Sequence, residues 1–442
     1  MKKTIFILSF LNSLYSVHAV GEEVICYAYS QQSLSNCVAS VLEGSVEKIE
    51  IAQDIYCDVS DQECTYRLND LNSNSREIEI YGAHADVTIY RNPSVNLFKI
   101  ENSSNITIRD LNIVDREKRS HDYQSCSYTA TESTPISIGM DISGGYGLSS
   151  NITLKNLHID TREPRIIDID RADNVNISNS SFTGSGHFGI WMSNQHLKSR
   201  IRIFDNTFSD IGTNAILTAN VDKAWINGNT LHNNHDDNPF CMPDGKHTGG
   251  GQLLIEQGTR DLTLQSNKIY DGGNSAVSGI EFANGSVASI TNVTIYANHI
   301  YNNPAGGIVF NSAVYENGIQ KVVIKDNALY NNLSPQIKIE GHIDVDVYDN
   351  YYTQDLSSSP RANFKGTPKT CKLNGNSICS IPVKWSTYNA SDVNVIVEDK
   401  VFSSNPSGKQ TAPWIGRAGA SFEIIKEDSS KELIARIYVE GE

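Results

Sequence analysis

Three segments of the chain, Arg200–Phe208 (RIRIFDNTF), Ala224–Leu231 (AWINGNTL) and Lys321–Leu329 (KVVIKDNAL), repeat one short unit. In each unit an apolar residue is followed three positions later by an Asn, and another apolar residue comes two positions after that Asn. Apolar and polar residues alternate before the Asn, and this period of two is typical of a strand with one buried face. The unit therefore predicts short strands that are joined by a turn at the Asn.

The unit recurs through the middle of the chain at a nearly constant interval. The spacing is 23 residues from Leu154 to Ile177, and again from Ile203 to Ile226. A period in the twenties that is built from short strands indicates a β-solenoid. The aligned residues are Asn206, Asn229, Asn267, Asn298, Asn327 and Asn350. Asn tolerates a positive φ, and its amide can reach the next coil about 4.8 Å away, so we expect these residues to form stacked turns.

This stacked-Asn pattern resembles the ladder of the right-handed parallel β-helix proteins of the pectate-lyase-like superfamily, over roughly residues 70–355. The resemblance implies an all-β fold, with a right-handed parallel β-helix of about ten coils. It also implies that the strand after each Asn turn belongs to a sheet that floors the substrate cleft. The expected strands of this sheet are Gly139–Ile142, Ile167–Ile169, Gly189–Met192, Ala215–Thr218, Leu253–Ile255, Gly279–Phe282, Gly307–Phe310 and Gln336–Ile339.

The two ends of the chain depart from the repeat. Residues 1–19 read as a secretory signal peptide, because two lysines precede a short apolar run that ends in small residues. We expect residues 20–70 to cap the β-helix, with a short helix over Ser33–Leu42, since an open solenoid end exposes unpaired strand edges. The expected domains are then a β-helix over 71–355, a linker over 356–380 and a small immunoglobulin-like β-sandwich over 381–442.

Composition narrows the class of partners. The 442 residues include 51 Asp and Glu against 36 Lys and Arg, a net charge of −15. This charge opposes binding to nucleic acid or to an anionic membrane, so we expect neither as a partner. We expect a secreted or periplasmic monomer whose partner is a polysaccharide.

Eight cysteines in an exported chain indicate disulfides. Pairing near neighbours gives Cys26–Cys37, Cys57–Cys64 and Cys371–Cys379. Two cysteines, Cys126 and Cys241, then remain, and both lie in long polar inserts. We expect them to form a fourth bond.

The first candidate site lies on the expected cleft sheet. Its outward row runs through Asp141, Asp168, Trp191, Leu217, Leu254, Glu281, Val309 and Lys338. Neighbouring carboxylates can share a proton, act as acid and base, or bind Ca²⁺, and a Trp can stack on a sugar ring. We predict four catalytic residues, Asp141, Asp168, Asp170 and His187, and three substrate contacts, Arg165, Arg171 and Trp191. The alternative is a solvated acidic face with Arg partners.

The order of these residues also resembles the polygalacturonases. In that family, Asp residues on adjacent coils precede a Gly-His-Gly. Here Asp168-Ile-Asp170 precedes Gly186-His187-Phe188-Gly189, with one extra residue. The family's later Arg-Ile-Lys is replaced by Ala215–Thr218, which puts uronate recognition of that kind in doubt.

The second candidate site is a polar insert that contains His232, His235, Lys246 and His247. Two histidines beside carboxylates could bind a metal, or they could act as base and acid while Lys246 neutralises a uronate. The alternative is a polar loop with chance histidines. We predict these four residues and Glu281 as substrate contacts and leave the identity of any metal open.

Two functions are consistent with this pattern. The first is an exported enzyme that cleaves a polysaccharide, by elimination or by hydrolysis. The second is a glycan-binding or adhesive β-helix without catalysis. A binder would favour rows of aromatic residues, and Trp191 is alone in its row, so the sequence leans toward an enzyme.

Overall fold

The computed structural model describes residues 24–57, 64–71, 76–91, 95–116, 134–139, 147–192, 196–234, 250–273, 277–283, 288–311, 318–333, 335–339, 343–427 and 431–442, with the backbone of 5–6, 16–20 and 23. The chain forms two compact units. The first is Met1–Trp225 with Asn234–His247, and the second is Ile226–Asn233 with Thr248–Glu442.

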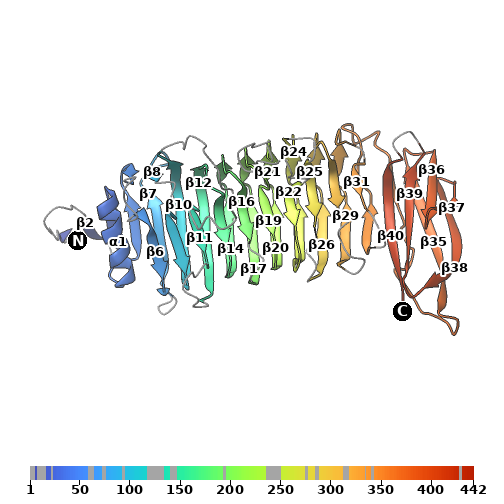
Figure 1. Cartoon of the computed structure of the whole chain (residues 1–442), viewed down its shortest axis with the longest axis horizontal. Helices are drawn as coiled ribbons and strands as arrows, with labels where there is room; N and C mark the ends of the chain where they lie inside the picture. Colours follow the sequence, from blue (N-terminus) through green and yellow to red (C-terminus); the bar gives the residue numbers. More distant parts are fainter. Residues whose placement is uncertain are drawn as a thin grey trace, which may run out of the picture. The chain divides into compact units, whose positions relative to one another are not determined.

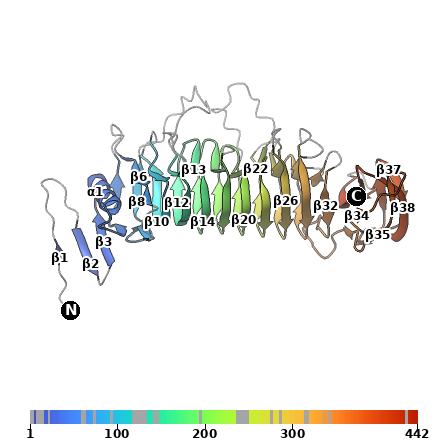
Figure 2. The same ribbon diagram turned by 90° about the horizontal axis from the view of Figure 1, so that it is seen from below.

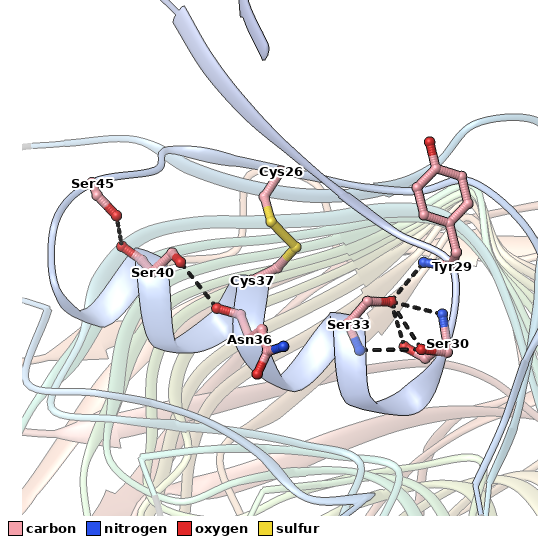
Figure 3. Close-up of a disulfide and its surroundings, with 8 residues drawn as sticks. All are labelled: Cys26, Tyr29, Ser30, Ser33, Asn36, Cys37, Ser40 and Ser45. Carbon is pink, nitrogen blue, oxygen red and sulfur yellow. Dashed lines mark hydrogen bonds between the residues drawn. A yellow bond between two sulfur atoms is a disulfide. The ribbon is translucent and has the colours of Figure 1, made fainter. Parts of the chain in front are cut away.

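A short helix covers the N-terminal end of the first unit. Helix α1 (Gln31–Leu42) packs against three strands, β3 (Glu23–Ala28), β4 (Lys48–Ile51) and β6 (Tyr66–Asn69). It begins with a capping box, in which the backbone N–H of Ser33 donates to Ser30 Oγ and that of Ser30 donates to Ser33 Oγ. The Cys26–Cys37 disulfide ties α1 to β3 (Figure 3). The expected capping helix is confirmed and starts two residues earlier than Ser33.

The first unit is built from parallel strands that stack coil upon coil (Figure 1). Strands on one side are β4, β7 (Ile78–Gly82), β10 (Ser104–Asp115), β12 (Ser149–Asp160), β14 (Ala172–Ser178), β17 (Lys198–Phe204) and the start of β20 (Val221–Asn227). After the turn come β5 (Ile55–Tyr56), β8 (Thr88–Arg91), β15 (Ser181–Thr183) and β18 (Thr207–Ser209). The neighbours β12 and β14 are seen side by side in Figure 2. Near the N-terminus, β1 (Ile5–Phe6) pairs with β2 (Ser16–Val20), which pairs antiparallel with β3.

The remaining strands of the first unit form the sheet that we expected beneath the cleft, here called the cleft sheet. Its order is β6, β9 (Phe98–Glu101), β11 (Ile136–Ile138), β13 (Arg165–Ile169), β16 (Phe188–Met192) and β19 (Ile216–Thr218). Ile167, Ile169, Ile190 and Met192 are fully buried beneath it. One expected strand, Gly139–Ile142, is wrong, because the strand of that coil is Ile136–Ile138.

The second unit has the same architecture. Its cleft-sheet strands are β22 (Gly250–Ile255), β25 (Val277–Phe282), β28 (Gly306–Phe310) and β31 (Ile337–Lys338). The other strands are β23 (Arg260–Gln265), β26 (Ile290–Tyr296), β29 (Ile319–Lys325) and β32 (Val345–Tyr348), and, after each turn, β21 (Thr230–His232), β24 (Lys268–Tyr270), β27 (His299–Tyr301) and β30 (Ala328–Tyr330). The right-handed parallel β-helix is confirmed.

Buried asparagines join successive coils of the second unit. The side chain of Asn298 accepts at Oδ1 from the backbone N–H and the amide of Asn267, at 2.9 Å each. Its own amide donates to Oδ1 of Asn327, also at 2.9 Å. The ladder is confirmed, but the left-handed backbone lies one residue earlier than expected, for example at Ala297 with φ 55° and Asp326 with φ 54°. The Asn therefore supplies hydrogen bonds between coils, while its predecessor makes the bend.

The C-terminal strands form two sheets that enclose an aromatic core. One sheet contains β33 (Arg361–Asn363), β35 (Ile378–Tyr388) and β38 (Ser407–Gly416). The other contains β34 (Thr370–Cys371), β36 (Val393–Val397), β37 (Lys400–Ser403), β39 (Ala420–Lys426) and β40 (Leu433–Gly441). Between them the rings of Trp385 and Phe402 meet edge to face, with centroids 6.1 Å apart. The expected sandwich is therefore present.

The stretch that we expected to be a linker, 356–380, instead contributes β33 and β34 to the two sheets. The C-terminal strands also meet the β-helix directly, since Val347 of β32 pairs with Arg436 of β40. Short edge strands of this kind carry too few residues to show a period in the sequence.

The three expected near-neighbour disulfides are confirmed, with Cα–Cα distances of 5.6, 5.7 and 5.9 Å for Cys26–Cys37, Cys57–Cys64 and Cys371–Cys379. Cys126 and Cys241 lie outside the described residues. In the part of the chain that the structure describes, no helix has the length and apolar character needed to span a bilayer.

Candidate active site

The register of the cleft sheet decides which side chains are neighbours. Asp168 lies opposite Trp191 on the following coil, and Trp191 lies opposite Leu217, as expected. On the preceding coil, however, the residue opposite Asp168 is Ser137, which in turn lies opposite Lys99. The predicted pairing of Asp141 with Asp168 in this row is therefore wrong, because β11 ends at Ile138. Asp141 itself lies outside the described residues.

Asp168 is a buried carboxylate that is held by one guanidinium. Its side chain is 1% exposed, and Oδ2 accepts a hydrogen bond from Arg165 Nη1 at 2.5 Å. The guanidinium carbon of Arg165 lies 3.0 Å from the centre of the Trp191 ring. Its place in the outward row therefore does not expose Asp168 to solvent, because Arg165 and the packing of the cleft sheet surround it. The predicted substrate contacts Arg165 and Trp191 do lie together with it.

A second carboxylate, Asp170, lies two residues further along the chain. Its Oδ2 is 2.9 Å from Nδ1 of His196. The other oxygen of each carboxylate, Oδ1 of Asp168 and Oδ1 of Asp170, is buried and makes no hydrogen bond with any described residue. Buried carboxylate oxygens are rarely left without a donor, so each of these atoms can accept a proton or a hydrogen bond from a ligand.

The two carboxylates share a buried cation. Lys198 is fully buried, and its ammonium donates to the carbonyl oxygen of Ala219 at 3.1 Å. Burial lowers the pKa of Lys198 to about 8, while the charges of Asp170 and Asp168 oppose that shift. Burial raises the pKa of Asp168 to about 6, and the adjacent Arg165 limits the rise. Asp168 can therefore gain and lose a proton near neutral pH.

His187 and Phe188 extend the site along an aromatic series. The His187 ring meets Phe188 edge to face at 4.3 Å, and Phe188 stacks on Trp191 at 5.8 Å. His187 is 8% exposed. Arg171 follows Asp170 directly and is half-buried. Of the first candidate site, the contacts thus join Asp168 to Arg165 and Trp191, and His187 to Trp191 through Phe188.

Within the described ranges, no group of three or more His, Cys, Asp and Glu side chains is placed to hold an ion. Arg165 and Lys198 already put positive charge beside Asp168, which is what Ca²⁺ would otherwise supply.

The second unit contains a separate pair of carboxylates on its own part of the cleft sheet. Glu281 is 9% exposed, and its Oε1 accepts from the amide of Asn311 at 3.3 Å. Burial raises the pKa of Glu281, and burial together with the charge of Glu281 raises that of Glu256.

His232, from the second candidate site, does not contact these two carboxylates. It lies on β21, where its ring stacks on Tyr270 at 5.3 Å. The other predicted loop residues, His235, Lys246 and His247, lie outside the described residues.

Sequence reasoning missed His196 and Lys198, and it placed Glu256 in a second outward row with Asp170 without counting it as a site residue. For Lys198 a signal was available. Each coil has a buried residue two positions before the left-handed residue that opens the repeat, and elsewhere this residue is Ser103, Ser149, Ala172, Val221, Thr259, Ile290 or Ile319. A Lys in a position otherwise filled by small or apolar residues indicates a buried charge with carboxylate partners.

Comparison with known proteins supports the fold. A family model described as "Right handed beta helix region" matches residues 78–245 and 149–351. The enzymatically active domain of tailspike protein 2 from bacteriophage CBA120 aligns with a TM-score of 0.52 at 10% identity, covering 96% of this chain and 77% of that one. A GH136 lacto-N-biosidase from Eubacterium ramulus aligns with a TM-score of 0.52 at 13% identity, covering 73% of this chain and 60% of that one. Among curated proteins, none matches the sequence. At these identities the structural likeness concerns the fold alone.

Proposed function

The chain belongs to the family of right-handed β-helix proteins, and on that premise we propose that it is an exported enzyme that hydrolyses a polysaccharide over β13 and β16. A β-helix by itself does not specify an activity, so the proposal rests on the side chains of the site. Export is supported by the predicted signal peptide and by disulfides, which persist in oxidising compartments.

One observation carries the proposal. Asp168 lies on β13 and Asp170 directly follows that strand, and each keeps one buried oxygen without a hydrogen-bond partner among the described residues. Glycoside hydrolysis requires two carboxyl groups, of which one gives a proton to the leaving oxygen and the other accepts a proton from water. With a pKa raised to about 6, Asp168 is suited to be the acid.

The second carboxylate has the surroundings of a base. Asp170 contacts the imidazole of His196, whose side chain is 33% exposed and can pass a proton toward solvent. In the proposed reaction the Asp170–His196 pair takes a proton from water as the water oxygen bonds to the anomeric carbon. The glycosidic C–O bond breaks, and Asp168 protonates the departing oxygen. Arg165 and Trp191 then contact the sugar next to the bond that breaks.

A second function is favoured by the position of Arg165. Its guanidinium already occupies the face of Trp191, and Asp168 is almost completely covered. A sugar must therefore displace Arg165 from the ring before it can stack there. If that displacement does not occur, the same surface supports a glycan-binding protein without catalysis, whose contacts are Arg165 and the aromatic series.

The test is a panel of polysaccharides assayed in parallel for new reducing ends and for unsaturated uronates. Hydrolysis yields only reducing ends, whereas elimination yields both. Asp168→Asn should abolish activity on the cleaved glycan. Asp205→Asn is the matched control, because Asp205 is an exposed residue of the β17–β18 turn in the same unit. Unsaturated products would exclude hydrolysis, and binding without any cleavage would favour the second function.

A further inference from the structure

A pocket of about 380 Å³ lies in the second unit, where the last strand of the β-helix meets the C-terminal sandwich. Its walls come from the end of β32, from the residues after β33 and from β40. The volume is within the range of about 300–1,000 Å³ that is typical of small-molecule sites. None of its residues belongs to the candidate active site, so the pocket is a separate question from catalysis.

The apolar part of the pocket is formed mainly by Tyr348, Phe364 and Ile437. Phe364 and Ile437 are each 6% exposed, so the surrounding residues hold the Phe364 ring and the Ile437 side chain in place. Aromatic and aliphatic surface of this kind contacts the C–H groups of a sugar ring, and it does so with little loss of side-chain freedom.

The polar part is a carboxylate that is held in place by an amide. Asn363 Nδ2 donates to Oδ1 of Asp349 at 3.2 Å. The Asn363 oxygen accepts from the backbone N–H of Lys365 and from Ser386 Oγ, at 3.2 Å each, so the amide is itself oriented. The second oxygen of Asp349, Oδ2, makes no hydrogen bond with any described residue. An oriented carboxylate with one available oxygen is suited to accept from the hydroxyl of a ligand.

The charges around the pocket nearly balance. The Lys369 ammonium is paired with Asp346, and Arg436 contacts Glu423 at 3.4 Å and Ser421 Oγ at 2.7 Å. The ammonium of Lys365, which also lines the pocket, has no ion-pair partner among the described residues. The pocket therefore presents both a donor and an acceptor without an excess of either sign, which disfavours a ligand with a net charge.

From these contacts we propose that the pocket binds one neutral sugar residue of a glycan, a hexose or an N-acetylhexosamine. Asp349 Oδ2 accepts from a hydroxyl, Lys365 donates to an adjacent one, and Tyr348 with Phe364 contacts the ring. The site goes beyond the proposed hydrolysis, because it requires no catalysis and lies on the sandwich side of the second unit. Such a site would hold the protein on its polymer by a second point of attachment and so raise the effective affinity.

The experiment uses the full chain and ligand-observed NMR with glucose, galactose, N-acetylglucosamine and glucuronate as probes. Asp349→Asn tests the carboxylate without changing its shape. Asp349 has a φ of 54°, a conformation that Asn adopts readily, so the backbone is preserved. Asp326→Asn is the matched control, because Asp326 has the same φ of 54° on the preceding coil and does not line the pocket. Tyr348→Ala removes the ring contact, and Trp191→Ala removes the proposed cleft contact.

We expect at least one neutral sugar to bind, with affinity reduced at least tenfold by Asp349→Asn and by Tyr348→Ala. Asp326→Asn and Trp191→Ala should leave it unchanged. Binding of glucuronate alone, loss of binding in Trp191→Ala only, or equal affinity in all four variants would each overturn the proposal. Since cleavage is not measured here, the pocket and the hydrolytic site can fail independently.

Discussion

The guanidinium of Arg165 lies between the ring of Trp191 and the carboxylate of Asp168, 3.0 Å from the ring centre and 2.5 Å from the acceptor oxygen. One side chain thus links the predicted sugar contact to the predicted acid. Any ligand that stacks on Trp191 must also disturb the ion pair of Asp168. In the proposed reaction, binding on this face of Trp191 is therefore coupled to the protonation of Asp168.

We first predict that Trp191 determines substrate affinity. Trp191→Ala should raise KM at least tenfold and reduce binding of the same glycan to a catalytically inactive Asp168→Asn chain, because a stacked ring contact contributes about 1 kcal/mol or more. Trp191→Phe should retain most of the affinity. An unchanged KM in Trp191→Ala would place the sugar elsewhere.

The second prediction concerns pH. If Asp168 is the acid, kcat/KM should fall as the pH rises above about 6, where this carboxyl loses its proton. Lys198 lowers the pKa of Asp168 by its charge. Lys198→Met should therefore move the falling limb of the pH profile to higher pH, while Arg202→Met, an exposed substitution on the same strand, should not. The measurement is the pH dependence of kcat/KM for the wild type, Lys198→Met and Arg202→Met. If the falling limbs of the wild-type and Lys198→Met profiles coincide, Asp168 is not the acid.

The raised pKa of Asp168 also makes the free energy of unfolding depend on pH, and the direction of that dependence can be stated. Between pH 4 and pH 6 or so the folded protein binds the Asp168 proton more tightly than the unfolded chain does, since its pKa is raised to about 6. The contribution of Asp168 to the free energy of unfolding should therefore decrease as the pH rises through this window. Asp168→Asn should flatten this slope. Chemical denaturation at a series of pH values would show the slope, and a steeper slope in the variant would contradict the assignment.

A third test concerns His196. If the Asp170–His196 pair accepts the proton from water, His196→Ala should lower kcat by about 100-fold or more with little change in KM. His158→Ala is a matched control, because His158 is an exposed histidine of β12 in the same unit. A raised KM with an unchanged kcat in His196→Ala would instead indicate a binding role.

The Asn ladder allows a test of stability without reference to function. The Asn298 amide donates to Leu264 O, Tyr296 O and Asn327 Oδ1, and its oxygen accepts from Asn267. Asn298→Ala leaves several of these buried groups without partners, at a cost of about 1–3 kcal/mol for each. We expect the free energy of unfolding to fall by at least about 2 kcal/mol. Thr294→Ala, on the same coil, should change it by less than about 0.5 kcal/mol.

The fold could be predicted from the sequence because its period is local. The interval of 23 residues from Ile203 to Ile226 and the aligned Asn at the turns are visible without knowledge of any distant contact. The cap was equally accessible, since Ser30 and Ser33 mark a helix start and Cys37 has a near partner in Cys26. Where the repeat is interrupted by a long insert, as before β11, the alignment shifted by four residues and Asp141 was placed opposite Asp168 instead of Ser137.

The site was less predictable for a different reason. Alternation showed that Asp168 and Trp191 point away from the core, but not that Arg165 would cover them both. His196 and Lys198 lie outside the strands of the cleft sheet, so the alternation along those strands did not place them beside Asp170. Outward orientation and exposure to solvent are distinct properties, and only the first follows from the period of a strand.

The ladder described for Asn229, Asn267, Asn298, Asn327 and Asn350 also has an evolutionary consequence. Every link in it is the same amide-to-amide contact, so each coil offers identical bonding surfaces to the coil before and the coil after. After a coil is gained by tandem duplication, or lost by deletion of a complete repeat, the coils that become neighbours can form the same Asn contacts. Genes that encode such a protein can therefore change the length of the molecule in whole-coil steps, while the residues that cap the ends and those of the candidate active site are inherited unchanged.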